Sequence, residues 1–374
     1  MAYDIEETLD IEGHDVVKVS YPISSYVADK GFNDYIVRIL DKDNFDCIFT
    51  MNYIPALAKI SFLRKIKYIA WISDSPNYTT YSEMIHSPYN YIFHFDKKEV
   101  ENLRSTGAKN IFHIPLAVNT KRVTKQIETS KIQKNKYKAD VSFLGSLYSD
   151  RDFFDKISGI NDYQKGFVDA VIKAQLLFQG CDLIEEALPK SFIESVLKLV
   201  DFNMDSEIKL SDEKILLDLI RKKATSIERI ELLNFIAKKY QVVLYTGSAD
   251  NMLYHVENRG YLDYNTQMPV MFNSSKINLN ITLRSIQSGI SLRALDIMGA
   301  GGFLLSNWQP ELAECFEEGK EVVMYYDRND LMSKIEYYLQ NEDERMKIAE
   351  NGQKKIIEQF DYSCAWKKIF GVVF

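Results

Sequence analysis

The chain has 374 residues with 46 Lys or Arg and 53 Asp or Glu, which gives a formal net charge of −7. This length exceeds the roughly 100–200 residues of one domain and predicts two domains. The negative charge argues against nucleic acid as a partner, because its phosphate backbone requires a basic surface. No apolar run approaches the roughly 18 residues of a transmembrane segment, and the four cysteines form no C-x-x-C pair. We expect a cytoplasmic protein without a transmembrane segment.

Short β-rich runs alternate with helical stretches in the first third of the chain, which predicts a parallel α/β, Rossmann-like domain over residues 1–118. Its strands are expected at 15–20, 45–50, 67–73, 90–95 and 110–115. A Rossmann-like domain opens on an apolar strand in the middle of its sheet, whereas this chain opens on a helix. We therefore expect either about ten further residues upstream, which would supply that strand, or a sheet that is short by one strand.

A lysine-rich stretch at 119–138 lacks apolar periodicity and is interpreted as an interdomain linker, with a basic surface loop inside one domain as the alternative. The α/β alternation then starts again in a second Rossmann-like domain over 139–354, interrupted at 152–239 by a helical pattern that is interpreted as an insertion. Residues 355–374 are expected to form a helical tail that packs back on the N-terminal domain. The whole chain is thus expected to be α/β, with two facing Rossmann-like domains.

The stretch SGISLRALDIMGAGGFLLSN, residues 288–307, predicts a helix followed by a strand. Gly289 and Ser291 lie at the expected helix start, where free backbone N–H groups and the positive end of the helix dipole favour phosphate. Arg293 adds a positive charge, and Asp296 lies one turn along the same face, where it can accept hydrogen bonds from two ribose hydroxyls. A nucleoside diphosphate would satisfy both side chains; the alternative is a solvated Arg–Asp ion pair.

Further residues are expected near the same edge of the sheet, because ligands of open α/β sheets bind at the carboxyl ends of the strands. Glycine turns follow two predicted strands, and two cations flank a third. These residues are Gly145, Ser146, Tyr245, Gly247, Lys276 and Arg284. Gly301 and Gly302 are expected to keep the helix-to-strand return tight and to let a ligand approach the backbone closely.

The run over 272–352, together with VSFLGSLYSDR, YIAWISDSP and FHFDKKEVENLRSTGAKNIFHIPLAVN, resembles the CgeB-like glycosyltransferases, which have the GT-B fold. The resemblance implies an enzyme that binds a nucleotide-sugar donor in its C-terminal domain and an acceptor in its N-terminal domain. It implies that Asp296 replaces a ribose-binding Glu, which is one methylene longer, and that Arg284 and Arg293 face the diphosphate. It further implies that the diphosphate is bordered by Gly145 and Ser146 and the base by Tyr245 and Gly247.

Fixed arginines and helix N-termini can stabilise the diphosphate leaving group without a metal ion. The alternative is a D-x-D motif that binds a divalent cation, and the chain contains one at Asp41–Asp43. That motif lies in the other domain and is assigned to a loop. The five histidines show no metal-ligand spacing. We expect no metal and no cofactor, with the nucleotide sugar as substrate.

Asp74 in WISDSPNY is the first candidate for a catalytic base, because it directly follows a predicted buried strand. The alternative is a turn-capping role with Ser75 and Pro76. His94 and Asp96, beyond the next strand, are the second candidates. The sequence leaves open whether the anomeric configuration is inverted or retained, and therefore whether a base is needed.

These observations predict a metal-independent glycosyltransferase that moves a sugar from a nucleotide-sugar donor to an unidentified glycan, protein or small-molecule acceptor. Two other classes would share the donor site. One is a nucleotide-sugar epimerase of GT-B fold, which needs no acceptor. The other is a non-catalytic nucleotide-sugar binding protein, in which the helical insertion would be a docking surface.

Overall fold

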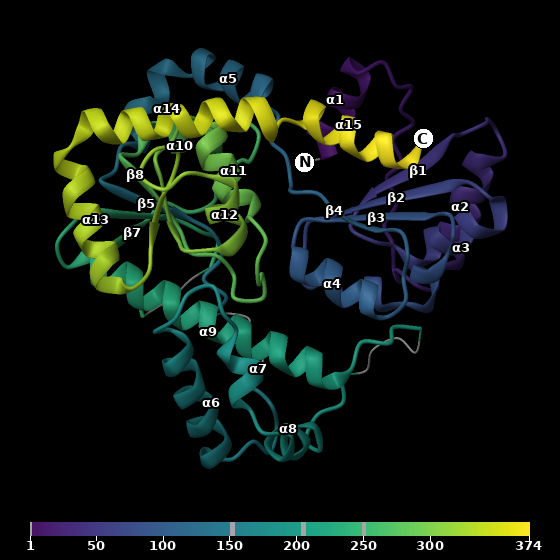
Figure 1. Ribbon diagram of the computed structural model, residues 1–374, viewed down its shortest axis with the longest axis horizontal. Coiled ribbons are helices and arrows are strands. Elements are labelled where there is room, and N and C mark those ends of the chain that lie inside the picture. The colour runs from purple at the N-terminus through teal and green to yellow at the C-terminus, as the bar shows by residue number, and fades with distance from the viewer. Residues whose placement is uncertain (1, 150–153, 203–206, 249–251) are drawn as a thin grey trace. The chain divides into compact units, whose positions relative to one another are not determined.

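The computed structural model describes residues 2–149, 154–202, 207–248 and 252–374, without the side chains of 131–133. The chain divides into two compact units, and each is described by itself (Figure 1). The first unit contains Met1–Leu116, Phe202–Asp212 and Tyr362–Phe374. The second contains Ala117–Asp201 and Glu213–Asp361. Each unit has its own parallel sheet, so the predicted α/β class with two Rossmann-like sheets is confirmed.

The sheet of the first unit has four parallel strands in the order β1-β2-β3-β4. They are β1 (Cys47–Met51), β2 (Lys67–Ile72), β3 (Asn90–His94) and β4 (Ile111–His113). In the two central strands, Ile69, Ala70 and Ile92 are fully buried. Strands that are covered on both faces read as continuous apolar runs, which is why the sequence predicted them.

The helices of this unit begin and end at capping residues that the sequence supplies. Asp29 accepts a hydrogen bond from the Phe32 N–H at 2.9 Å, and Lys65 ends a helix in the left-handed region with a φ of 57°. The helices are α1 (Ala2–Ile11), α2 (Lys30–Leu40), α3 (Pro55–Arg64), η1 (Tyr78–Tyr81), η2 (Glu83–His86), α4 (Lys97–Ser105) and α15 (Tyr362–Val373).

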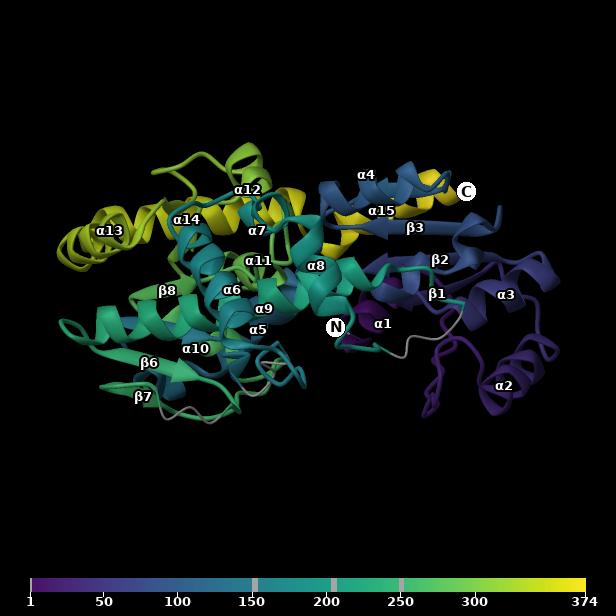
Figure 2. The same cartoon turned by 90° about the horizontal axis from the view of Figure 1, so that it is seen from below.

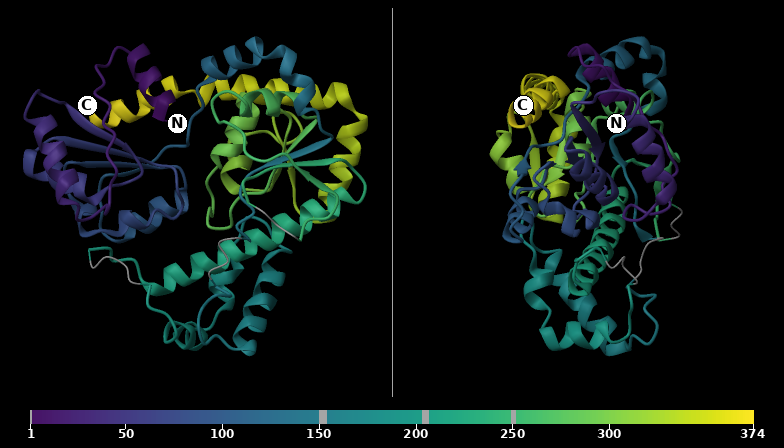
Figure 3. Two further views of the ribbon diagram at one scale, coloured as in Figure 1. Left: turned by 180° about the vertical axis from the view of Figure 1, so that it is seen from behind. Right: turned by 90° about the vertical axis from the view of Figure 1, so that its right-hand side faces the viewer.

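Helix α15, the C-terminal yellow helix, belongs to the first unit and lies beside α1 (Figure 3). Trp366 of α15 is 1% exposed, and its indole N–H donates to the Thr8 hydroxyl of α1 at 3.0 Å. The Trp366 ring also packs edge-on against Trp71 of β2 and Phe49 of β1. The tail therefore completes the core on one face of the first sheet.

The expected strand at 15–20 is wrong. These residues adopt neither helix nor strand, and Val17 is 56% exposed. Within the described residues β1 pairs only with β2, so no strand is present to accept residues 15–20 as a sheet neighbour. Apolar alternation alone does not form a strand when the hydrogen-bonding partner is absent.

The expected linker at 119–138 is also wrong, because it forms α5 (Thr120–Thr129) and the short helix η3 (Lys131–Tyr137) in the second unit. Asn119 caps α5 by accepting from the Arg122 N–H at 3.0 Å. Val123 is buried, and the Thr120 hydroxyl donates to Asp361 at 2.6 Å. Only Thr120 and Val123 of α5 are buried, so the helix packs through few apolar contacts and its sequence shows no apolar periodicity.

The sheet of the second unit has six parallel strands in the order β10-β9-β8-β5-β6-β7, and Figure 2 shows β6 and β7 side by side at one edge. The strands are β5 (Val141–Leu144), β6 (Val242–Tyr245), β7 (Val256–Asn258), β8 (Ile277–Asn280), β9 (Leu304–Asn307) and β10 (Val323–Tyr325). The strand order reverses between β5 and β8, the position where doubly wound sheets bind ligands. Strand β7 was not predicted, because its residues are half-buried or exposed.

Helices from both ends of the second unit cover this sheet. Leu233 and Ile236 of α9 and Ile335 of α13 pack into one core cluster with the strands. The helices are α6 (Asp162–Gln175), α7 (Leu183–Ala187), α8 (Lys190–Leu197), α9 (Asp212–Ala237), α10 (Met268–Ser274), α11 (Leu292–Gly299), α12 (Pro310–Cys315), α13 (Arg328–Gln340) and α14 (Glu342–Gln359).

The predicted insertion at 152–239 is helical over α6 to α9, but one part of it belongs elsewhere. Phe202–Asp212 is grouped with the first unit. Within this segment Ile208 forms an antiparallel bridge with Ser82, and the Lys209 N–H donates to the Tyr81 carbonyl at 2.8 Å.

Candidate nucleotide-binding site

The N-terminus of α11 lies at the carboxyl end of β8, next to the reversal of strand order. Ser291 is the N-cap residue, and its hydroxyl accepts from the Ala294 N–H at 3.3 Å. Gly289 is buried just before the helix. The helix thus starts at Ser291, as the sequence predicted, and its first backbone N–H groups and the positive end of its dipole lie at the carboxyl end of β8.

Arg293 and Asp296 lie together on α11, with 3.5 Å between Nη1 and Oδ2. The carboxylate side chain is 6% exposed and the guanidinium side chain 28% exposed. Desolvation lowers the pKa of Arg293, and the Asp296 carboxylate opposes this effect. The expected ion pair is present, but its carboxylate is buried, unlike that of a solvated surface pair.

Tyr264 was not singled out by the sequence, yet its phenol O–H donates to Asp296 Oδ1 at 3.1 Å. The two residues are 32 positions apart, so no local sequence pattern could predict this hydrogen bond. Tyr264 lies in the segment between β7 and α10.

Two sequence-predicted glycine turns also lie at the carboxyl edge. Gly145 follows β5, and its N–H donates to the Tyr245 carbonyl of β6 at 3.2 Å. Ser146 follows Gly145 beyond the end of β5, one of the two strands between which the strand order reverses. Tyr245 is buried, with its phenol 3.5 Å from Arg259, whereas a Cβ atom added at Gly247 would meet nothing within 4 Å. Gly247 therefore leaves open space beside the strand ends.

Arg284 does not face this space, which corrects the expected diphosphate contact. Its Nε and Nη2 atoms donate to the two carboxylate oxygens of Glu228 at 2.9 and 2.6 Å. Its Nη1 atom donates to the Phe178 carbonyl at 3.0 Å. Both side chains of the ion pair are buried, at 7% and 5% exposure. The guanidinium thus fixes α9 to the loop after β8.

Arg229 of α9 is a further arginine at the carboxyl edge that the sequence did not reveal. Its guanidinium donates to the Ile281 carbonyl at 2.5 and 3.2 Å and to the Ser146 carbonyl at 2.5 Å. Burial lowers its pKa. Arg229 therefore ties together the segments that follow β5 and β8. Its position in a long helical run gave no signal of this role.

Lys276, Gly301 and Gly302 lie at the amino-terminal ends of β8 and β9, opposite to the carboxyl ends where the candidate site is. Their predicted place at the site is therefore wrong. Lys276 directly precedes β8 and pairs with Asp140 at 2.8 Å. Gly301 and Gly302 join the C-terminus of α11 to the start of β9. Gly301 has a φ of 66°, and a Cβ atom at Gly302 would lie 2.7 Å from the Phe272 carbonyl oxygen. Both glycines serve the backbone turn and its packing.

In the first unit, Asp74 is exposed just beyond the carboxyl end of β2. Its carboxylate accepts from the Asn52 side-chain amide at 2.8 Å, while the Asn52 oxygen accepts from the Ser73 N–H at 2.9 Å. Asn52 follows β1 and has a φ of 61°. This network holds Asp74 at the strand ends and leaves it accessible to solvent.

His94 and Asp96, the second candidates, are both fully buried. Asp96 caps α4 by accepting from the Lys98 N–H, and its other oxygen accepts from the Ser75 hydroxyl at 3.0 Å. Burial lowers the pKa of His94 to about 4, which the neighbouring Asp96 opposes and His113 reinforces. These contacts give the pair a structural role at the start of α4.

The D-x-D motif at Asp41–Asp43 has local structural partners. Asp41 forms an ion pair with Arg64 at 2.8 Å, and Asp43 accepts from the Asn44 N–H at 2.8 Å. Among the residues that the structure describes, no three His, Cys, Asp or Glu side chains gather to hold a metal ion. No helix in the described ranges is both long enough and apolar enough to cross a membrane.

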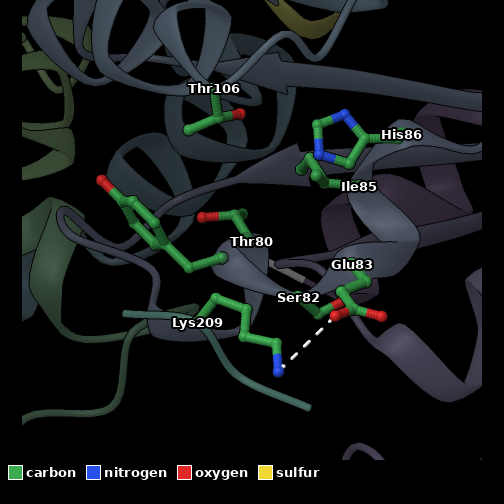
Figure 4. Close-up of a pocket in the computed structure, with 8 residues that line it drawn as sticks. Thr80, Ser82, Glu83, Ile85, His86, Thr106 and Lys209 are labelled. Atoms are coloured by element: carbon green, nitrogen blue, oxygen red, sulfur yellow. Dashed lines mark ion pairs between the residues drawn. The ribbon is translucent and has the colours of Figure 1, made fainter. Parts of the chain in front are cut away.

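A small cavity of about 110 Å³ lies in the first unit, beside η1 and η2 (Figure 4). Lys209 and Glu83, two of its lining residues, approach each other at 3.5 Å. Thr106, from the end of α4, also lines it. None of the residues predicted from the sequence lines this cavity, so it does not define the candidate site.

Part of the chain matches a known protein family, and the whole fold resembles solved structures. Residues 227–371 match the model of a family described as glycosyl transferase-like. No curated protein matches the chain. Among solved structures, the chain is similar to HepE from Anabaena in complex with UDP-glucose, with 11% identity and a TM-score of 0.51 over 91% of this chain and 81% of HepE.

It is also similar to sucrose-phosphate synthase from Thermosynechococcus elongatus, with 11% identity and a TM-score of 0.50 over 91% of this chain and 77% of the synthase. Identities this low show the fold alone, and they confirm the predicted GT-B fold. The chain thus has the GT-B fold, and a part of it, residues 227–371, matches the glycosyl transferase-like family.

Proposed function

We propose that the protein transfers a sugar from a nucleotide-sugar donor bound at the N-terminus of α11. The observation that supports this most directly is the grouping of Ser291, Arg293 and Asp296 at the reversal of strand order, inside the segment that matches the glycosyl transferase-like family. HepE, with which the chain shares its fold, was solved with UDP-glucose, and this makes UDP-sugars the first donors to test.

In this proposal each residue type matches one part of the donor. Backbone N–H groups of α11 and the Arg293 guanidinium bind the diphosphate. Asp296 accepts hydrogen bonds from ribose hydroxyls. Gly145 and Ser146 border the diphosphate, and the open space at Gly247 accommodates the base. Arg229 acts as a positioning residue, because it fixes the carbonyls of both flanking segments.

We propose that the reaction needs no metal, because the positive helix end and Arg293 can stabilise the charge that develops on the leaving diphosphate. Asp74 is the proposed base in the acceptor-binding unit, since it is exposed and held by Asn52 at the strand ends. The glycine and Arg/Asp motifs of 272–352 support a CgeB-like enzyme. The four cysteines form no disulfide, which supports a cytoplasmic location.

The first test is a thermal-shift screen with UDP-glucose and other nucleotide sugars, followed by titration of Arg293→Ala and Asp296→Ala. A donor at one hundred times its Kd stabilises by about 2.7 kcal/mol. Each substitution is expected to weaken donor binding by about 1.5–3 kcal/mol, because a charge-assisted hydrogen bond is lost. Lys276→Ala is the control, since Lys276 lies at the opposite edge and should leave the Kd unchanged.

Donor affinity that is unchanged in both variants would refute the site. Transfer to an acceptor in the presence of EDTA is expected, and complete loss that Mn²⁺ or Mg²⁺ restores would refute metal independence. An isomerised donor without transfer would identify an epimerase. Binding without turnover across an acceptor panel would identify a non-catalytic binding protein.

A further inference from the structure

Asp296, the proposed ribose ligand, is engaged by a tyrosine from another part of the second unit. The Tyr264 phenol donates to Asp296 Oδ1 at 3.1 Å. A phenol O–H and a ribose O–H are both neutral hydroxyl donors, and a carboxylate oxygen binds them in the same way. The Asp296 side chain is only 6% exposed, so the room for several donors around it is limited.

The segment that presents Tyr264 is held by its own hydrogen bonds. Asp263 accepts from the Asn265 N–H, the Thr266 N–H and the Thr266 hydroxyl at 3.1, 2.8 and 2.6 Å. Its own N–H donates to the Gln267 side chain at 2.9 Å. The Thr266 and backbone hydrogen bonds lower the pKa of Asp263, so the carboxylate that maintains this turn stays ionised at neutral pH.

Arg122 of α5 packs against the Tyr264 ring. The Arg122 guanidinium lies 5.5 Å from the centre of the Tyr264 ring and donates to the Asn265 carbonyl at 2.8 Å. This arrangement joins α5, the 263–267 turn and α11 through one aromatic ring. The Tyr264 hydroxyl is therefore aimed at Asp296 by contacts that do not involve Asp296 itself.

We propose that Tyr264 competes with the ribose of the donor for Asp296 and thereby sets the affinity for the nucleotide. Donor binding then requires the Tyr264–Asp296 hydrogen bond to break before ribose hydroxyls can take its place. The proposal rests on the proposed function, because it assumes that Asp296 binds ribose. It deepens that function by assigning an affinity-determining role to a residue of the 263–267 turn.

The test compares Tyr264→Phe with the wild-type protein by calorimetric titration of UDP, ADP, GDP and CDP. For the nucleotide that the wild type binds most tightly, Tyr264→Phe is expected to lower the Kd about 10- to 150-fold, the effect of one hydrogen bond to a charged carboxylate. Tyr261→Phe is the matched control, because Tyr261 lies in the same segment with 77% of its surface exposed, and its Kd should not change.

The 2′- and 3′-deoxy forms of that nucleotide identify the contact. The gain in affinity from Tyr264→Phe should shrink for the form that lacks the competing hydroxyl, and it should disappear in the Asp296→Ala background, which has no side-chain acceptor. An unchanged or raised Kd in Tyr264→Phe overturns competition. If the wild type binds none of the four nucleotides, the donor site itself is overturned, which is a distinct result from bound nucleotide without a gain.

Discussion

At the scale of single residues, the partners of an arginine decide its role more than its position in the sequence. Three arginines near the reversal of strand order in the second sheet illustrate this, namely Arg229, Arg284 and Arg293. Arg229 donates to backbone carbonyls, Arg284 is fully used by Glu228 and Phe178, and Arg293 keeps 28% of its side chain exposed. Of these three, only Arg293 combines a fixed charge at a helix N-terminus with access from solvent.

Arg284→Ala is therefore expected to change stability rather than donor binding. It leaves the buried Glu228 carboxylate without its charge partner, which should lower the free energy of unfolding by about 3–5 kcal/mol. Urea denaturation measures this loss, and donor titration of the folded variant should give a Kd close to that of the wild type. Lys276→Ala breaks an exposed pair and should cost at most about 1 kcal/mol. If Arg284→Ala instead keeps the wild-type free energy of unfolding but binds the donor much more weakly, Arg284 belongs to the donor site after all.

At the scale of elements, the sequence predicted the strands well, because each buried parallel strand is a short apolar run between turn residues. It also predicted the start of α11 from Ser291 and the side chains that follow. The partners of Asp296 and Arg284 could not be predicted, since Tyr264 and Glu228 lie 32 and 56 residues away. Helix α5 was missed because Val123 is its one fully buried apolar side chain.

Gly247 follows the carboxyl end of β6 and Gly302 precedes the start of β9, so substitutions of these two glycines should have different effects. Gly302→Ala is expected to destabilise the protein by about 1–3 kcal/mol, because a Cβ atom there overlaps the Phe272 carbonyl oxygen at 2.7 Å. Gly247→Ala meets nothing within 4 Å and should keep the melting temperature, while the added methyl group weakens donor binding. Differential scanning calorimetry and donor titration measure both effects. A destabilised Gly247→Ala, or a Gly302→Ala with wild-type stability, would contradict this assignment.

At the scale of the whole molecule, the first unit is built from three segments that are far apart in the sequence. The chain enters the second unit at Ala117, and both Phe202–Asp212 and Tyr362–Phe374 belong to the first unit. Helix α15 is thus the last segment of the sequence and also part of the core of the first sheet. The stability of the first unit therefore depends on residues more than 240 positions beyond Leu116, the end of its main segment.

Trp366→Ala tests this dependence. Trp366 is 1% exposed and contacts Thr8, Phe49 and Trp71, so its truncation should cost about 3–5 kcal/mol and lower the unfolding temperature of the first unit. The transition that a bound nucleotide stabilises belongs to the second unit and should keep its temperature. Phe374→Ala, in the same tail with 65% of its surface exposed, should cost at most about 1 kcal/mol. If Trp366→Ala instead lowers the nucleotide-stabilised transition, α15 supports the second unit and its assignment to the first sheet is wrong.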